Sequence, residues 1–274
     1  MVYGSMDHRA GSVSVVTLRK MRGEGEPIAC LTAYDASFAR LVDAAGTDLV
    51  LVGDTLGMVV QGHASTVPVT MDDMVYHTRL VARGIERALL VADMPFLSYT
   101  TPEVALRNAG RLMQEAGARM VKLEGTGDQA AIVAALSGNG IPVCAHLGLR
   151  PQAVEKIGGF RLQGRKPDEA KQILADAREL ERAGADIILL ECVPRELAAQ
   201  IHEAVAVPVI GIGAGAEVDG QILVLYDILG ITTGRKPRFA KNYMDAAGSV
   251  QAAIEAYVRE VKNRAYPQAE HGFD

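Results

Sequence analysis

The chain has 274 residues, of which 49% are hydrophobic and 22% charged, and its formal net charge is -5. This length suits one α/β barrel, and the apolar fraction is large enough to bury a sizeable core. The acidic balance and the lack of a basic stripe argue against a nucleic-acid binder. No apolar run approaches the roughly 18 residues of a membrane span, and residues 1–16 do not show the pattern of a signal peptide.

The three cysteines, Cys30, Cys144 and Cys192, are widely spaced, and each lies in an apolar run. An odd number at such spacing is typical of buried free thiols in a reducing compartment rather than of disulfides or a thiolate metal site. We therefore expect a cytoplasmic protein that has no nucleic-acid or membrane partner.

Short apolar runs, most of them rich in β-branched residues, recur about every 20 to 40 residues, which is the spacing of βα units. Because they are apolar throughout rather than alternating, they are typical of parallel strands that are covered on both faces. Seven runs are clear and the eighth is weaker. The predicted strands are Ile28–Tyr34, Leu49–Gly53, Ala88–Ala92, Met120–Leu123, Ile141–Ala145, Ala185–Leu190, Val207–Ile212 and Gln221–Leu225.

Helical spacing of apolar residues predicts helices between these strands, and Pro102 and Pro167 each place a proline in a first helical turn, where its missing N–H costs nothing. A short first helix should close the bottom of the barrel, and another should end the chain. The predicted helices are Ser12–Arg22, Met71–Glu86, Pro102–Glu115, Pro167–Arg182, Pro194–Val205 and Tyr243–Asn263. Together these elements predict one (β/α)8 barrel domain over residues 1–274. Its ordered core spans about 17–262, and residues 1–11 and 265–274 form frayed tails.

An ionisable side chain directly follows five of the eight predicted strands. In a parallel barrel all strands end at the same face, which is where active sites are built. A single acid at a strand end often only caps the next helix, whereas five such residues at one rim predict a functional site. The five residues are Asp54, Asp93, Glu124, His146 and Glu191.

Asp54, Asp93 and Glu124 come from three consecutive strands, so their carboxylates are expected to approach one point. Such carboxylates repel one another unless a cation lies among them. Oxygen ligands without a nearby cysteine favour Mg²⁺ or Mn²⁺ over Zn²⁺. Lys122 is two residues before Glu124 and points the same way along its strand. It would pair either with an anionic substrate or with a neighbouring structural acid.

Glu191 comes from the other side of the predicted barrel and follows the apolar segment Ile187–Leu190. Apolar surroundings raise the pKa of a carboxyl group, which suits Glu191 to act as a general base or acid. His146 on the fifth strand could hydrogen-bond a substrate oxygen, but a lone histidine at such a position is also compatible with a purely structural role.

Seven segments carry a more specific signal. They are Leu31–Asp35, Val52–Met58, Ala92–Phe96, Val121–Gly125, His146–Leu149, Gly159–Phe160 and Gly211–Gly215. As a set and in this order, from about residue 17 to 260, they resemble the ketopantoate hydroxymethyltransferase (3-methyl-2-oxobutanoate hydroxymethyltransferase) family. Thr55 stands where that family commonly has Ser, and it keeps the hydroxyl. Ala145, Arg150 and Ala216 stand where Gly, Thr and Asn are frequent.

The resemblance implies a barrel of the phosphoenolpyruvate/isocitrate-lyase type that assembles as a homodecamer. It implies transfer of a hydroxymethyl group from 5,10-methylenetetrahydrofolate to 3-methyl-2-oxobutanoate, giving 2-dehydropantoate in pantothenate biosynthesis. The implied cofactor is Mg²⁺, which would polarise the ketone of the 2-oxo acid and stabilise an enolate.

The resemblance also assigns roles to residues of this chain. Its implied magnesium ligands are Asp54, Asp93 and Glu124. Its implied substrate-binding residues are Asp54, Thr55, Asp93, Lys122 and His146. Its implied proton acceptor is Glu191.

Two other functions remain open from the sequence. One is a Mg²⁺-dependent lyase or mutase that acts on another 2-oxo acid, because such an enzyme shares the enolate chemistry. The other is a catalytically silent barrel that serves as a binding or scaffold protein. The second is disfavoured because five ionisable groups at one rim are costly to keep without a function.

Overall fold

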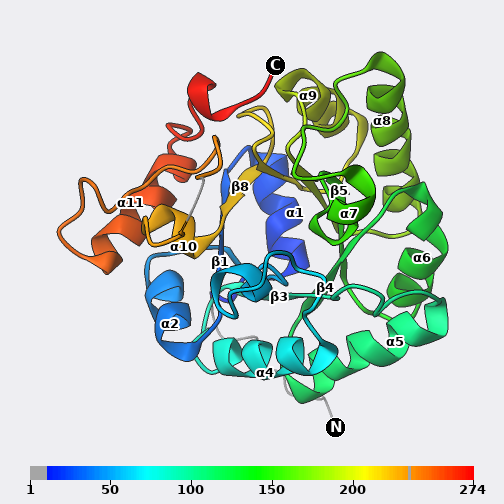
Figure 1. The fold of residues 1–274 in the computed structure, drawn as a ribbon, viewed down its shortest axis with the longest axis horizontal. Helices are drawn as coiled ribbons and strands as arrows, with labels where there is room; N and C mark the ends of the chain where they lie inside the picture. Colours follow the sequence, from blue (N-terminus) through cyan, green and yellow to red (C-terminus); the bar gives the residue numbers. More distant parts are fainter. Residues whose placement is uncertain (1–10, 234–235) are drawn as a thin grey trace, which may run out of the picture.

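Eight parallel strands close into a barrel in a computed structural model that describes residues 11–233 and 236–274 (Figure 1). Each strand pairs with the next in the sequence, and β8 returns to β1. The strands are β1 Ile28–Thr32, β2 Leu49–Val52, β3 Leu89–Asp93, β4 Met120–Glu124, β5 Val143–Gly148, β6 Ile187–Glu191, β7 Val209–Ile212 and β8 Gly220–Leu223. The predicted barrel, including its weakest strand, is therefore confirmed.

Closure of the barrel depends on a glycine at the first residue of β8. Gly220 pairs with Ile28 of β1, and a Cβ atom at this position would lie 2.4 Å from the carbonyl oxygen of Ile28. No real side chain tolerates that contact, so only glycine lets the last strand approach the first.

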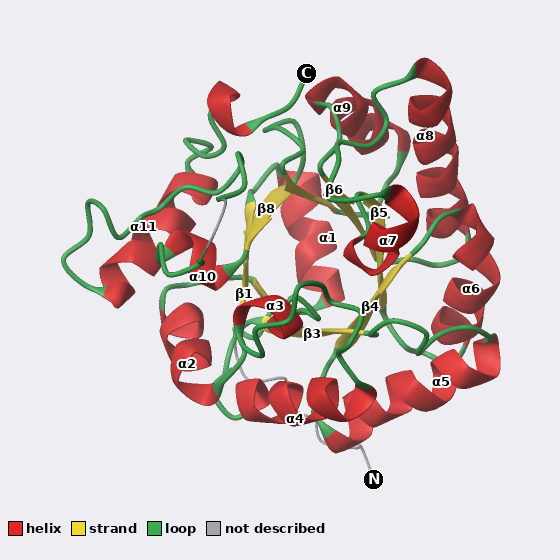
Figure 2. Cartoon of the chain, viewed as in Figure 1, coloured by secondary structure: helices red, strands yellow, loops and turns green. Residues whose placement is uncertain are grey.

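Helices surround the barrel on the outside (Figure 2). The longer helices are α2 Ala36–Ala44, α4 Met71–Ala82, α5 Pro102–Gly110, α6 Ala130–Gly138, α8 Pro167–Arg182, α9 Arg195–Ala204 and α11 Val250–Lys262. Three single-turn helices follow β2, β5 and β8: α3 Leu56–Val59, α7 Val154–Ile157 and α10 Leu225–Ile228. Side chains of Thr70, Thr101 and Ser249 cap the starts of α4, α5 and α11. These caps satisfy backbone N–H groups that would otherwise lack partners.

The predicted helix boundaries hold in part. The segment Pro167–Arg182 is α8 with the predicted bounds, whereas the C-terminal helix begins at Val250 rather than Tyr243. It begins there because Ser249 is extended and its side chain accepts a hydrogen bond from a backbone N–H in the first turn. The predicted helix from Pro102 continues after α5 as a π-helical segment, Arg111–Glu115. Helices α2 and α6 were not predicted.

The first helix, α1 Val15–Glu24, lies across the amino-terminal end of the barrel, as predicted, and is visible through the ring of strands in Figure 1. Arg22 anchors it, because its guanidinium pairs with Asp219 at 2.6 Å and donates to the carbonyl oxygens of Val205 and Val207. These partners precede β7 and β8, so the helix closes the face opposite the predicted site.

The expectation that residues 265–274 are frayed is wrong. Tyr266 and His271 are buried, and the Tyr266 hydroxyl donates to the carbonyl oxygen of Phe239. The backbone N–H of Arg195 donates to the carbonyl oxygen of Phe273 at 3.0 Å. Aromatic side chains thus give this segment a packed position that its polar composition concealed. Apart from Gly11, the segment expected to fray at the other end lies outside the described residues.

Two further expectations concern composition. Cys30, Cys144 and Cys192 are free and buried, as predicted. Within the part of the chain that the structure describes, no helix is both long enough and apolar enough to cross a membrane.

Tyr257 of α11 should stabilise the closure of the barrel. Its buried hydroxyl lies 2.8 Å from the carbonyl oxygen of Cys30 in β1 and 2.9 Å from that of Gln221 in β8. Tyr257→Phe is expected to lower the free energy of unfolding in urea by about 1 kcal/mol, because one buried hydrogen bond is lost. The exposed Tyr76 offers a control, and Tyr76→Phe should leave the unfolding midpoint unchanged. Equal midpoints for both variants would contradict this role.

Candidate active site

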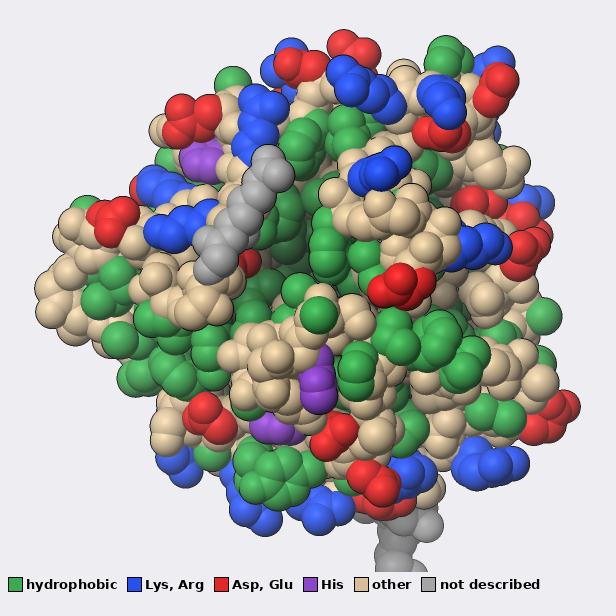
Figure 3. Space-filling model, viewed as in Figure 1, with side chains coloured by type: hydrophobic (Ala, Val, Ile, Leu, Met, Phe, Trp, Pro, Cys, Tyr) green, Lys and Arg blue, Asp and Glu red, His purple; other side chains and the backbone are tan. Residues whose placement is uncertain are grey.

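A cavity of about 700 Å³ opens at the carboxyl ends of the strands. In Figure 3 its mouth is a hollow that is walled mainly by hydrophobic side chains, with Lys and Arg side chains near its upper edge. All seven residues that the sequence nominated line this one cavity: Asp54, Thr55, Asp93, Lys122, Glu124, His146 and Glu191. The structure therefore places all the nominated residues around one cavity, while their roles remain predictions.

Strand pairing places the ionisable groups differently from what the sequence suggested. Asp93, Glu124 and Glu191 are the last residues of their strands rather than the first residues after them. His146 lies inside β5, because its backbone pairs with Glu124 and the ladder continues until Gly148 pairs with Glu191. The ladder extends each strand beyond its apolar run, since hydrogen bonding to both neighbours does not require an apolar side chain.

Lys122 lies among the carboxylates on the cavity floor. Its ammonium is 2.6 Å from Oδ1 of Asp93, and both side chains are buried. Burial acts to lower the pKa of Lys122, but the charges of Asp93, Glu124 and Asp54 outweigh it and raise that pKa above its ordinary value. Lys122 therefore carries a positive charge, and of the two partners considered above it takes the neighbouring acid.

Asp54 and Glu124 are held by Gln152, which the sequence analysis did not nominate. Its side-chain Nε2 donates to Oδ2 of Asp54 at 2.8 Å, and its backbone N–H donates to Oε2 of Glu124 at 3.0 Å. Burial and the nearby charge of Asp93 raise the pKa of Asp54 to about 7. Burial and the charge of Asp54 raise the pKa of Glu124 above its ordinary range. These carboxylates therefore lie close together, and Lys122 offsets only part of their negative charge.

The donor set fits a hard cation in its chemistry, although it is not a preformed cage. Among the residues that the structure describes, no three His, Cys, Asp or Glu side chains are placed to hold one metal ion. Mg²⁺, however, is commonly held by one or two carboxylates, with oxygens of substrate and water completing its shell. The buried Oε1 of Glu124 has no hydrogen-bond partner in the described chain. Asp54 and Asp93 are adjacent, because the N–H of Asp54 donates to Oδ2 of Asp93 at 3.0 Å.

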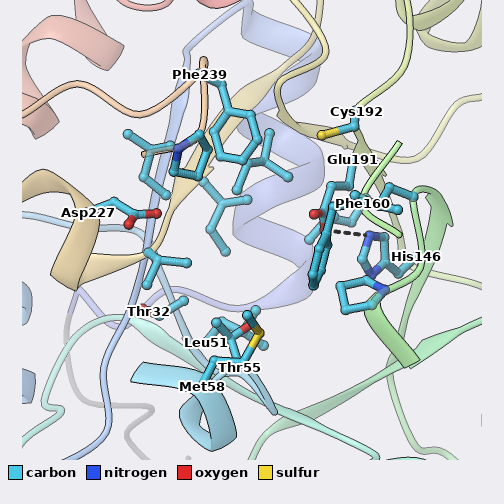
Figure 4. A pocket seen from close by; sticks show the side chains of 18 of the residues that line it. Thr32, Leu51, Thr55, Met58, His146, Phe160, Glu191, Cys192, Asp227 and Phe239 are labelled. Carbon is cyan, nitrogen blue, oxygen red and sulfur yellow. Dashed lines mark ion pairs between the residues drawn. The ribbon is translucent and has the colours of Figure 1, made fainter. Parts of the chain in front are cut away.

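His146 and Glu191 form a pair on one wall of the cavity, as Figure 4 shows. Nε2 of His146 lies 3.2 Å from Oε2 of Glu191, and Nδ1 of His146 lies 3.2 Å from the ammonium of Lys122. Burial and the charge of Lys122 lower the pKa of His146 well below its ordinary value, so its imidazole is neutral. Because an ammonium can only donate, Nδ1 accepts and the proton of the imidazole is on Nε2, facing Glu191.

Burial raises the pKa of Glu191 to about 7, against a smaller lowering effect of Lys122. The apolar strand that precedes Glu191 predicted this direction, and the prediction is confirmed. Such a carboxylate can accept a proton near neutral pH and release it again. The site thus separates a cationic centre at Lys122 from a proton acceptor at Glu191, with a neutral imidazole between them.

Aromatic and basic residues form the outer part of the cavity. Phe160, Phe239 and Phe273 line it, together with Arg161, Lys236 and Arg238. A Cβ atom at Gly213 would lie 2.7 Å from the ring of Phe239, so the glycine-rich segment lets the rings pack closely. The floor therefore holds the carboxylates around Lys122, and the outer part carries three basic side chains, with Asp227 also among the lining residues.

Comparison with known proteins identifies the family. A family model described as ketopantoate hydroxymethyltransferase matches residues 12–269. The chain belongs to the ketopantoate hydroxymethyltransferase family. It is 59% identical to the 3-methyl-2-oxobutanoate hydroxymethyltransferase of Alkalilimnicola ehrlichii over 95% of this chain and 94% of that protein. It is 58% identical to the enzyme of the same name from Halorhodospira halophila over the whole of both chains. It is accordingly an enzyme of the transferase class.

Solved structures extend the comparison to the fold. A putative phosphonomutase from Burkholderia cenocepacia has a TM-score of 0.61 at 19% identity, covering 79% of this chain and 94% of that one. A 2,3-dimethylmalate lyase, described as a member of the PEP mutase/isocitrate lyase superfamily, has a TM-score of 0.56 at 20% identity, covering 79% and 81%. This chain thus shares its barrel fold with these two enzymes.

Some residues of this site could not be found by reasoning from the sequence. Gln152 and Tyr99 follow no strand-end pattern, and Phe239 and Phe273 lie far along the chain from the carboxylates. Phe160 carries no sequence signal beyond the segment Gly159–Phe160, which resembles the family. For Gln152, the only sequence signal is its place directly after Pro151 in the loop that follows β5. This signal does not indicate a functional residue unless the fold is known.

Lys122 should be the residue on which the stability of this site depends most. Lys122→Met is expected to lower the free energy of unfolding by about 3–5 kcal/mol at pH 8, because it leaves buried carboxylates without their cation. The loss should shrink towards pH 6. Carboxyl groups whose pKa is raised in the folded state, such as Asp54, take up protons there more readily than in the unfolded chain.

Urea unfolding at the two pH values measures both effects. Lys171→Met, at an exposed position of α8, removes the same charge from the surface and should change stability by less than about 0.5 kcal/mol. A Lys122→Met loss that is independent of pH would contradict the electrostatic explanation.

Proposed function

We propose that this enzyme transfers a hydroxymethyl group from 5,10-methylenetetrahydrofolate to 3-methyl-2-oxobutanoate, giving 2-dehydropantoate in pantothenate biosynthesis. Family membership over nearly the whole chain supports the reaction class. The observation that carries the proposal is the arrangement of the cavity. The buried ammonium of Lys122 lies among carboxylates on the cavity floor. The same cavity contains Glu191, a carboxyl group whose pKa is about 7.

Glu191 is proposed to accept the proton from C3 of the 2-oxo acid. A proton acceptor works best when its pKa lies near the operating pH, and burial brings that of Glu191 to about 7. The imidazole of His146 lies 3.2 Å from this carboxylate and is neutral, so it adds no positive charge that would weaken Glu191 as a base. Removal of the proton leaves an enolate, whose C3 forms a bond to the one-carbon unit. The methylene group of the folate carries no oxygen, so one water molecule supplies the hydroxyl group, the bonds from the one-carbon unit to the folate nitrogens break, and tetrahydrofolate is released.

Lys122 is proposed to stabilise the negative charge that develops on the substrate. Its ammonium is fixed by Asp93 before substrate binds, so it does not need to reorganise as the charge develops. Thr55 lines the same cavity and offers a hydroxyl group to the substrate carboxylate. His146 completes the proposed substrate contacts.

Asp54, Asp93 and Glu124 are the residues proposed to hold Mg²⁺. When bound, the ion would supply Lewis-acid polarisation of the substrate ketone. The support for this assignment is the crowding of buried carboxylates and the unpartnered Oε1 of Glu124. Both features describe a site that favours added positive charge.

The outer part of the cavity is proposed to bind the folate. A volume of about 700 Å³ falls in the range of sites for drug-sized ligands, and a small 2-oxo acid would fill only part of it. Phe160 and Phe239 offer flat apolar surfaces for a pterin ring (Figure 4). Arg161, Lys236 and Arg238 place positive charge where an anionic glutamate tail would leave the cavity.

A lyase or mutase acting on another 2-oxo acid is the alternative within the same fold, and a silent binding barrel is the alternative outside enzymology. Two assays separate them. Mg²⁺-dependent exchange of deuterium at C3 of 3-methyl-2-oxobutanoate tests the enolate step. Product formation with and without methylenetetrahydrofolate, in Mg²⁺ and in EDTA, tests the transfer. An enzyme that catalyses neither reaction would exclude the proposed function.

Glu191→Gln should reduce the rate of deuterium exchange by about a hundredfold or more, because the general base is lost. In the unchanged enzyme the exchange rate should rise between about pH 6 and pH 8, since Glu191 accepts protons only when ionised and its pKa is about 7. Glu196→Gln, in the first turn of α9, makes the same change at an exposed position and should preserve the rate. A pH profile that survives in Glu191→Gln would assign the base elsewhere.

Phe160→Ala should raise the KM for methylenetetrahydrofolate about fivefold, because one stacking surface of about 1 kcal/mol is lost. The KM for 3-methyl-2-oxobutanoate should change little, as the residue is half exposed and belongs to the outer cavity. Phe96→Ala is a suitable control, because Phe96 is similarly exposed but lines a different cavity. An increase confined to the 2-oxo acid would contradict the assignment of the outer cavity.

The homodecamer, implied by the family resemblance, and the cytoplasmic location, expected from the free cysteines, are parts of this proposal. Light scattering on the purified protein measures the number of subunits directly.

A further inference from the structure

Gln152 is an uncharged, buried residue that engages two floor carboxylates at once. It lies in the 3₁₀ turn Pro151–Ala153, after β5. Its backbone N–H donates to Glu124 and its side chain donates to Asp54. These two acids come from β4 and from the end of β2, on either side of β3. One residue therefore fixes the separation of two carboxylates that belong to different strands.

The amide of Gln152 can adopt only one of its two orientations. Its Nε2 donates both to Oδ2 of Asp54 at 2.8 Å and to the carbonyl oxygen of Met94 at 2.9 Å. The carbonyl oxygen of Met94 can only accept, so the NH2 group must face it and, with it, Oδ2 of Asp54. The remaining Oε1 accepts from the Tyr99 hydroxyl at 2.5 Å. Each hydrogen-bonding atom of the amide thus has a partner, and Tyr99 supports its orientation.

Gln152 stands behind the carboxylates rather than in the substrate cavity. Asp54 and Glu124 line the main cavity, whereas Gln152 and Tyr99 line a second cavity of about 190 Å³. Glu124 lines both, so it forms part of the wall between them. From this place Gln152 reaches the substrate only through the two carboxylates.

We propose that Gln152, oriented by Tyr99, is the positioning residue that holds Asp54 and Glu124 ready for a divalent cation and the 2-oxo acid. The identity of those ligands rests on the proposed function. Gln152 engages one oxygen of each carboxylate, which leaves Oδ1 of Asp54 and Oε1 of Glu124 for a ligand. A neutral amide fixes the acids without cancelling their charge, whereas a second lysine in this place would compete with the bound cation.

Binding of Mn²⁺ to the purified enzyme without substrates tests the proposal, with free Mn²⁺ measured by electron paramagnetic resonance. Gln152→Met keeps the size of the side chain and the backbone N–H but loses the bond to Asp54. Its Kd for Mn²⁺ should rise about 10- to 100-fold, as for other residues that orient metal ligands. Tyr99→Phe removes only the orienting hydroxyl, and its Kd should rise about fivefold.

Gln172→Met provides the matched control. Nε2 of Gln172 donates to Oδ1 of the buried Asp176 at 2.8 Å, far along the chain and outside the cavity lining. The control therefore loses the same type of bond, and its Kd for Mn²⁺ should equal that of the unchanged enzyme. Thermal unfolding of all three variants reports how much each loses in stability alone.

An unchanged Kd in Gln152→Met, with a stability loss like that of Gln172→Met, would overturn the proposal and leave Gln152 purely structural. If Gln152→Met does not fold, Tyr99→Phe decides in the same way, because it retains the amide and nearly all of the side-chain volume. An enzyme that takes up no Mn²⁺ also overturns it. Mn²⁺ binding that depends on Gln152 in an enzyme without folate-dependent product supports this inference and rejects the proposed function alone.

Discussion

The buried ion pair between Lys122 and Asp93 is the interaction on which the rest of the site depends. An ammonium placed inside the barrel lacks the solvation that water provides, and it remains charged because three carboxylates surround it. Those carboxylates in turn remain close together only because Lys122 offsets part of their repulsion. The cavity floor is therefore a cluster of mutually dependent charges, in which no member would be stable alone.

Neutral residues organise the space around this cluster. His146 accepts from Lys122 through Nδ1 and so turns its other nitrogen towards Glu191. Gln152 connects Asp54 to Glu124 from behind. Because neither residue adds a formal charge, the electrostatic balance is left to the carboxylates, Lys122 and whatever binds between them. This division separates the groups that fix geometry from those that carry charge.

Much of the barrel could be predicted because each βα unit is encoded locally. Apolar runs identified all eight strands, and the strand ends with the spacing of Lys122 identified six residues that line the cavity. The family resemblance alone added Thr55. The predicted ends of the strands and helices were less accurate than the number and order of the strands. The strand β5 continues through His146 because that residue pairs with Glu124 of β4. The C-terminal segment is packed because the Tyr266 hydroxyl donates to the carbonyl oxygen of Phe239. Both facts depend on neighbours that are distant in sequence.

The sequence by itself determined the fold class, the family resemblance and the acids at the carboxyl ends of the strands, since each is encoded in short local segments. Only the tertiary structure decided that Lys122 pairs with Asp93, that His146 faces Glu191 and that Gln152 joins Asp54 to Glu124. These contacts join different strands and loops. Their partners are selected by the closure of the barrel, and no local pattern contains that information.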